Sequence, residues 1–241
     1  MWLNNALYGW YPYVALTVFL LGCLLRFDYA QYTWRSGSSQ LLRRKQLMWG
    51  SNLFHVGILV IFFGHLVGLL TPISVFDAIG IGHGFKQLMA IWVGGIAGIF
   101  CLIGIALLTH RRLFDARIHA TSSLGDIAIL LILFAQLLLG LATIPVSVGH
   151  LDGHEMVKFM NWAQGILLLR TDVWMLVVDA HPIFKAHLIL GMTIFLVFPF
   201  TRLVHVWSAP VWYLGRRGYQ VVRSTRSGRS AVRRPNAVPA E

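Results

Sequence analysis

Five long apolar stretches follow one another along the chain, and most charged residues fall in the segments between them. Each stretch is close to the ~20 residues that an α-helix needs to cross the hydrocarbon core of a bilayer. The pattern therefore predicts five membrane-spanning helices, over about residues 8–26, 50–70, 87–109, 124–145 and 184–207. The segment EMVKFMNWAQGILLLR (residues 155–170) is shorter and more polar, and its two unlike faces predict a helix at the membrane surface.

The composition agrees with an all-α membrane protein. The chain is 57% hydrophobic and 12% charged, whereas soluble domains carry about 25% charged residues. No Lys or Arg precedes Arg26, so the first stretch lacks the basic start of a signal peptide and is expected to remain as a span. Cys23 and Cys101 lie in apolar stretches without a CxxC or CxxCH pattern, which argues against an iron–sulfur cluster or a c-type haem on this chain.

The basic residues predict the orientation of the helices. They gather in the loop after the first stretch, the loop after the third, and the segment after the fifth, whereas most acidic residues lie in the other loops. The positive-inside rule then places the N-terminus outside and the C-terminus in the cytoplasm. The net charge of +11 is thus a topology signal rather than a sign of nucleic-acid binding. We expect residues 1–219 to form the membrane domain and residues 220–241 a basic, disordered cytoplasmic tail.

Four histidines lie inside the expected spans. His55 and His65 belong to the second span, and His187 and His205 belong to the fifth. A single intramembrane histidine is more often a hydrogen-bonding residue or a proton relay than a metal ligand. Because the two spans run in opposite directions, however, His55 and His205 are expected near the cytoplasm, and His65 and His187 near the outside. Two facing pairs at two depths predict bis-imidazole ligation of two b-type haems.

The surroundings of these histidines favour the same interpretation, with one mismatch. Glycines lie close to them in the sequence and could leave room for a porphyrin, although glycines also serve ordinary helix packing: Gly57, Gly64, Gly68 and Gly191. Ten residues of an α-helix rise about 15 Å and eighteen rise about 27 Å, so the two pairs cannot both be level. Tilted helices, inclined ligand axes and a bend near Pro199 could absorb the difference.

Three arginines and one lysine are further candidates for the site. Arg202, three residues before His205, and either Arg111 or Arg112 could pair with haem propionates, but lipid headgroups and topology explain them equally well. Lys86 stands where the third span begins on the outer side. It could hydrogen-bond a quinone or quinol oxygen, or it could be an interfacial lysine whose head reaches into water.

Iron with two imidazole ligands has no free position for oxygen chemistry, which leaves one-electron transfer and points to a quinol as the membrane-soluble donor. A dihaem subunit of another quinone-linked reductase, of the sulfur-compound or heterodisulfide type, is an alternative. A transporter of metal ions or protons is a third possibility. It predicts polar residues in several spans, and only Asp126 and Gln136 stand out.

Four extended strings resemble the gamma subunit of respiratory nitrate reductase, the membrane cytochrome b of that complex. They are RFDYAQYTWRSGSSQ (26–40), SNLFHVGILVIFFGH (51–65), TIPVSVGHLDG (143–153) and HLILGMTIFLVFPFTRLVHVWSAPVWYL (187–214). The resemblance implies that His55 and His205 ligate the haem nearer the cytoplasm, and His65 and His187 the outer haem. It also implies that Lys86, in FKQLMA, lines the pocket where menaquinol or ubiquinol is oxidised.

The same resemblance implies partners and a location. Electrons would pass inward to an iron–sulfur (beta) subunit and then to a molybdenum (alpha) subunit that reduces nitrate, in the bacterial cytoplasmic (inner) membrane. The first cytoplasmic loop is expected to dock these subunits, with its aromatic residues as anchors: Tyr29, Tyr32 and Trp34.

Overall fold

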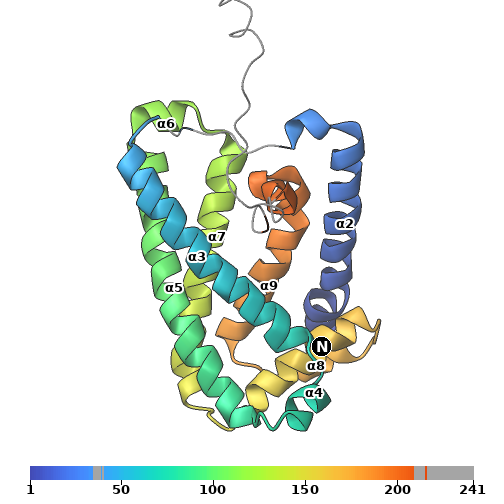
Figure 1. The fold of residues 1–241 in the computed structure, drawn as a ribbon. Helices are drawn as coiled ribbons and strands as arrows, with labels where there is room; N and C mark the ends of the chain where they lie inside the picture. Colours follow the sequence, from blue (N-terminus) through green and yellow to red (C-terminus); the bar gives the residue numbers. More distant parts are fainter. Residues whose placement is uncertain (35–38, 40, 209–214, 216–241) are drawn as a thin grey trace, which may run out of the picture. The chain divides into compact units, whose positions relative to one another are not determined.

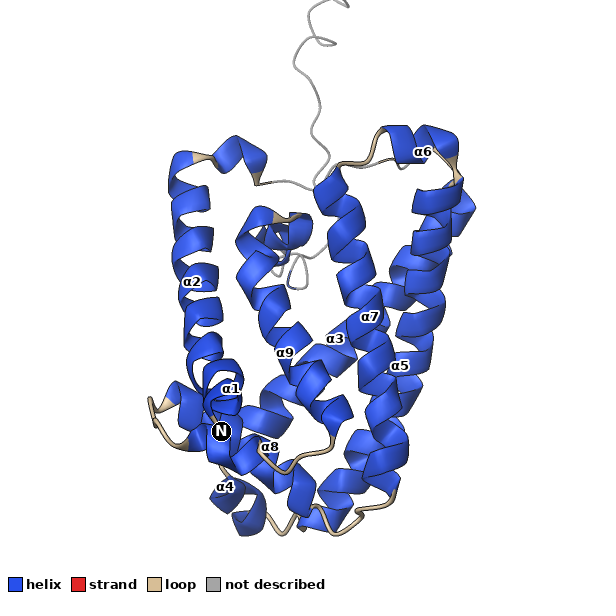
Figure 2. Ribbon diagram, turned by 180° about the vertical axis from the view of Figure 1, so that it is seen from behind, coloured by secondary structure: helices blue, strands red, loops and turns tan. Residues whose placement is uncertain are grey.

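The computed structural model describes residues 1–34, 39, 41–208 and 215, and the elements of this part of the chain are all helical (Figures 1 and 2). Five of its helices are long and apolar enough to cross a membrane, as predicted: Trp2–Tyr29, Arg44–Leu70 (α3), His83–Phe114 (α5), Leu124–Val148 (α7) and Pro182–Phe200. The first comprises α1 (Trp2–Asn5), a π-helical turn η1 (Ala6–Trp10) and α2 (Tyr11–Tyr29). The expected tail, residues 220–241, lies outside the described residues.

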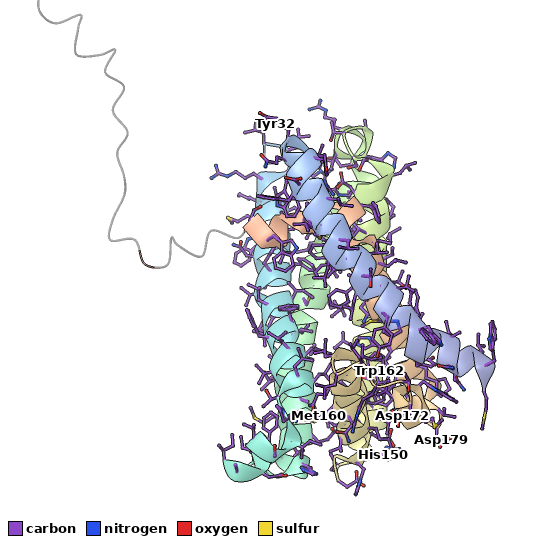
Figure 3. All side chains as sticks on the ribbon, turned by 90° about the vertical axis from the view of Figure 1, so that its right-hand side faces the viewer. Tyr32, His150, Met160, Trp162, Asp172 and Asp179 are labelled. Atoms are coloured by element: carbon purple, nitrogen blue, oxygen red, sulfur yellow. The ribbon has the colours of Figure 1, made fainter. Side chains whose placement is uncertain are left out.

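Short helices lie at the two ends of the long ones. At one end, the α6 end, are η2 (Gln31–Thr33) and α6 (Ala116–Ala120). At the other, the α8 end, are the N-terminus, α4 (Ile73–Ala78), α8 (His154–Leu167) and η3 (Val173–Val177). Figure 3 accordingly shows Tyr32 at one end and His150, Asp172 and Asp179 at the other. Helix α8 corresponds to the expected surface helix.

Within residues 1–207 the long helices are packed as a series of neighbours. Helix α3 packs on α5, α5 on α7, α7 on α9 (Pro182–Val197), and α9 on α2. Helix α3 runs obliquely across the others (Figure 1). It makes little contact with α9 or α2 in the described part of the chain, although α8 touches it at the α8 end. The oblique course of α3 is a helix tilt, one of the features that could absorb the unequal histidine spacings.

Glycine lets α3 and α5 approach closely. A Cβ atom on Gly104 would lie 2.3 Å from the main-chain nitrogen of Phe54, and one on Gly57 would lie 2.6 Å from the carbonyl oxygen of Ala97. Cys101 is fully buried in the same contact and carries a free thiol. Gly57 therefore serves helix packing, and the expectation that it leaves room for a cofactor is wrong.

The sequence predicts one continuous helix over residues 184–207. In the structure this fifth apolar stretch is broken. Helix α9 ends at Val197, a 3₁₀ turn η4 follows (Phe198–Phe200), Thr201 is extended with ψ 178°, and a second 3₁₀ helix η5 (Arg202–Ser208) begins. Pro199 cannot donate a main-chain hydrogen bond, which ends the α-helix here. The Thr201 hydroxyl donates to the Phe198 carbonyl (3.0 Å) and accepts from the Leu203 N–H (3.3 Å), so Thr201 closes one segment and starts the next.

Arg26 of α2 holds this break in place. Its Nη1 donates to the carbonyl oxygens of Pro199 (2.5 Å) and Thr201 (2.9 Å), and its Nε and Nη2 donate to Thr33. Gly22, one turn earlier on α2, lets Pro199 approach, because a Cβ there would lie 2.7 Å from the proline ring. The carbonyls that a helix end leaves unpaired are thus bonded by a cation.

Candidate functional site

The four histidines lie opposite one another as two pairs. His55 on α3 and His205 on η5 have ring centres 6.3 Å apart, nearer the α6 end. His65 on α3 and His187 on α9 have ring centres 6.1 Å apart, nearer the α8 end. The structure therefore brings together the two residues of each expected pair, from segments more than a hundred residues apart.

Three of the four rings are held by a main-chain carbonyl. Nδ1 of His55 lies 2.7 Å from the Ser51 oxygen, Nδ1 of His65 lies 2.8 Å from the Ile61 oxygen, and Nδ1 of His205 lies 2.6 Å from the Arg202 oxygen. A carbonyl can only accept, so Nδ1 carries the proton in each ring. The lone pair is then on Nε2, which is the arrangement of a metal-binding imidazole.

The spacing of the pairs fits a metal ion bound between two imidazoles. With metal–nitrogen bonds of about 2 Å, two axial rings have centres roughly 6 Å apart. Among the described residues there is no group of three or more His, Cys, Asp or Glu that could hold a metal ion. A metal between these rings would therefore need further ligands that arrive with it, as the porphyrin nitrogens of haem do.

The glycines that lie near the histidines in the sequence differ in how much free space surrounds them. A Cβ atom on Gly64 or Gly68 would meet nothing within 4 Å, so α3 is open on both sides of His65. Gly191 is different, because a Cβ there would lie 3.2 Å from Nε2 of Gln136 on α7. Open space at Gly64 and Gly68, together with the scant contact between α3 and α9, suits a flat group between these helices.

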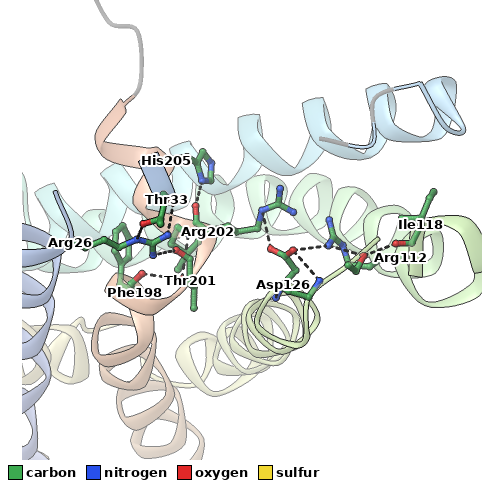
Figure 4. Close-up of polar contacts among 12 residues, drawn as sticks. Arg26, Thr33, Arg112, Ile118, Asp126, Phe198, Thr201, Arg202 and His205 are labelled. Carbon is green, nitrogen blue, oxygen red and sulfur yellow. Dashed lines mark hydrogen bonds and ion pairs between the residues drawn. The ribbon is translucent and has the colours of Figure 1, made fainter. Parts of the chain in front are cut away.

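A charged cluster lies beside His205 at the α6 end (Figure 4). Asp126 pairs with Arg112 of α5 and Arg202 of η5, each at 3.6 Å. Ser123 fixes Asp126 by a capping box at the start of α7, because each side chain accepts a hydrogen bond from the other residue's main-chain N–H. Two of the predicted propionate partners, Arg112 and Arg202, thus share one carboxylate.

Arg111 has a different environment from Arg112. Its side chain is buried, and its Nη2 donates to the carbonyl oxygens of Ser39 and Leu42, both at 2.7 Å. The guanidinium therefore ties Ser39 and Leu42, which precede α3, to α5.

Lys86 points into the protein at the α8 end. Its Nζ donates to Sδ of Met160 (2.7 Å) and lies 3.7 Å from the centre of the Phe76 ring. The pocket around it has an empty volume of about 220 Å³ and is lined by Ile73, Phe76, His83, Lys86, Gly153, Met156, Val157 and Met160. The lysine that could have extended freely into water is therefore enclosed by α4 and α8.

The structural role of Arg26 was not predicted from the sequence, in which its charge indicated only the orientation of the helices. A signal was present: it is the first charge after a long apolar stretch, where a cation can bond the carbonyls of a helix end. Two of its partners, the carbonyl oxygens of Pro199 and Thr201, belong to residues more than 170 positions later in the chain.

Five apolar helices and paired histidines between them define the class of the protein, an integral membrane protein with a polar site inside its helix bundle. The family model for the nitrate reductase gamma subunit matches residues 4–225. The respiratory nitrate reductase 2 gamma chain of Escherichia coli (strain K12) is 53% identical over 225 residues, covering 93% of this chain and 99% of that one. The nitrate reductase gamma chain of Bacillus subtilis (strain 168) is 40% identical over 221 residues, covering 91% and 98%.

The nitrate reductase-like protein NarX of Mycobacterium tuberculosis (strain H37Rv) is 33% identical over 219 residues, which are 88% of this chain and 33% of that protein. The chain belongs to the gamma-subunit family of respiratory nitrate reductases and is a membrane subunit of such a complex. Membership of this family decides between the complexes considered above, in favour of nitrate reductase, and against a transporter.

Proposed function

We propose that the chain is a dihaem cytochrome b that oxidises quinol near the α8 end and delivers electrons at the α6 end. An iron–sulfur subunit would receive them there, and a molybdenum subunit would use them to reduce nitrate. The observation that carries the proposal is the presence of two opposed imidazole pairs at two depths, with ring centres 6.1 and 6.3 Å apart.

Each pair would hold one iron through Nε2. His55 and His205 would bind the haem nearer the α6 end, and His65 and His187 the one nearer the α8 end. Haem b, when bound by these residues, would supply one-electron transfer. Arg112 and Arg202 would place positive charge beside the propionates nearer the α6 end, and the shared carboxylate would keep both side chains in position.

Lys86 would bind the quinol. Oxidation of a quinol yields a quinone, two protons and two electrons, so the hydroxyl oxygens gain negative charge as the protons leave. The ammonium group can donate to such an oxygen. Its present partners, a thioether sulfur and an aromatic face, are weak acceptors that a quinol oxygen would replace.

The orientation would place the α6 end in the cytoplasm. This end carries many basic residues, including Arg43, Arg44, Lys45, Arg111, Arg112, Arg117 and Arg202, whereas the loops of the α8 end carry Asp77, Asp152, Glu155, Asp172 and Asp179. Tyr29 and Tyr32 at the α6 end are 82% and 95% exposed, which suits anchors for partner subunits. Trp34, by contrast, packs edge-on against Phe27.

The test is a pyridine haemochrome assay with a reduced-minus-oxidised spectrum on the purified chain. We expect two b haems per polypeptide, and one haem in either His65→Ala or His187→Ala, with loss of quinol-driven reduction. A His65→Ala or His187→Ala variant that retains both haems would show that the pairing is wrong. Absence of haem in folded wild-type protein would overturn the proposal as a whole.

A further inference from the structure

His187 differs from the other three histidines in what its Nδ1 contacts. The other rings donate Nδ1–H to a main-chain carbonyl three or four residues earlier. Nδ1 of His187 is buried and has no hydrogen-bond partner in the described structure, and the same is true of Oε1 of Gln136. If Nε2 of His187 binds a metal, its proton is on Nδ1, so an unpaired donor and an unpaired acceptor lie on neighbouring side chains.

Two residues of α7, Gln136 and Gly140, lie against His187. Nε2 of Gln136 donates to the main-chain carbonyl of His187 (3.1 Å) and lies 3.4 Å from Nε2 of the ring. Gly140 follows one turn later, and a Cβ there would lie 3.0 Å from Cε1 of the same ring. The small residue leaves room for the imidazole, and the polar one provides a hydrogen-bonding partner.

Burying a carboxamide inside an apolar helix costs free energy unless its polar groups form hydrogen bonds. The hydrogen bond to the His187 carbonyl satisfies one of its N–H groups, but the buried oxygen remains unpaired. An unpaired buried acceptor costs about 1–3 kcal/mol. The oxygen regains that energy only by accepting a hydrogen bond, and Nδ1 of His187 is the other buried polar atom of these two contacting residues that has no partner.

We propose that Gln136 is the positioning residue for His187, an inference that rests on the function proposed above. Its amide nitrogen holds the main-chain carbonyl of His187. When Nε2 of the ring leaves its 3.4 Å contact with that nitrogen to ligate iron, the amide oxygen accepts the Nδ1–H. Such a bond fixes the ring and makes the imidazole a stronger electron donor, which favours the ferric state. Gln136 thus provides for His187 what a backbone carbonyl provides for the other three ligands, and it sets the midpoint potential of the haem nearer the α8 end.

The test is a potentiometric titration of both haems in the purified holoprotein, with low-spin ferric EPR signals as a second readout. Gln136→Leu removes the acceptor, so we expect the midpoint of the α8-end haem to rise while the other midpoint stays unchanged. A tenfold weaker preference for the ferric state corresponds to about 59 mV for a one-electron couple. Gln136→Glu keeps an oxygen at the same reach, so its midpoint is expected at or below the wild-type value.

Thr193→Val is the matched control. It removes the 2.8 Å hydrogen bond between α9 and Tyr11 of α2 without touching His187, and should leave both midpoints unchanged. Loss of the α8-end haem in Gln136→Leu but not in Gln136→Glu would also support the proposal. Equal effects of the two Gln136 variants, or no effect of either with two haems bound, would overturn it while the proposed function stands. Wild-type protein with fewer than two haems would overturn the proposed function itself.

Discussion

Replacing Arg26 should selectively weaken haem binding at the α6 end. Arg26→Met removes two charged hydrogen bonds, to the carbonyls of Pro199 and Thr201, which are only four to six residues before His205. Hydrogen bonds to charged groups contribute about 1.5–3 kcal/mol each, and partial exposure reduces the sum for the pair to roughly 2–4 kcal/mol. If η5 must be held by these bonds to present His205, haem affinity at this pair falls roughly 30- to 1,000-fold.

The assay is haem stoichiometry on the purified variant, with a reduced-minus-oxidised spectrum to identify the remaining haem. We expect about one haem per chain in Arg26→Met and two in Arg43→Met. Arg43 is a suitable control because its ion pair with Asp115 is exposed at the same end and contributes little to stability. Two haems with unchanged spectra in Arg26→Met would show that Pro199 and Thr201 hold the break without Arg26.

Three further changes have expected outcomes. Gly104→Leu should lower the melting temperature and separate α3 from α5, because a Cβ there already lies 2.3 Å from the nitrogen of Phe54; Gly104→Ala should do so less. The hydrogen bond from Arg43 holds the pKa of Asp115 below its usual range. The ionised Asp115 therefore stabilises the fold above about pH 4, and this stabilisation is lost as the pH falls further. Asp115→Asn should remove that acid dependence, measured by thermal unfolding between pH 3 and 7 (roughly one unit below to three above the usual pKa). Lys86→Met should raise the KM for quinol about tenfold, the equivalent of one ~1.4 kcal/mol hydrogen bond, with both haems retained; an unchanged KM would mean that Lys86 is an interfacial lysine.

Hydropathy was sufficient to find the five long helices, because burial in lipid requires long apolar segments whatever their packing. The histidine pairs followed from the alternating direction of the spans, and the structure places His55 with His205 and His65 with His187. Side-chain partners from distant segments could not be found in this way. The role of Gly57 depends on where α5 lies, which local sequence does not specify.

The helix break shows the same limit of local reasoning more clearly. Pro199 marks a place where a helix can end, but the extended backbone at Thr201 and the new direction of η5 depend on contacts with α2. Similarly, Lys86 is equally suited to water and to a pocket until α8 is seen to cover it. Chemistry-bearing residue types were thus recognisable from the sequence, whereas their surroundings required the fold.

Among the described residues, the main contacts of α3 with elements other than α5 lie at the α8 end. At the α8 end, α8 links α3 to the rest of the bundle, and Nε2 of Gln164 donates to the carbonyl oxygens of Leu69 and Thr71 (2.9 and 3.1 Å), where α3 finishes. Towards the α6 end, α3 depends on α5 for support. A haem between His55 and His205 would therefore connect α3 to η5 on this side of the bundle. Such a haem would then add to the packing of the membrane domain on this side as well as carry electrons.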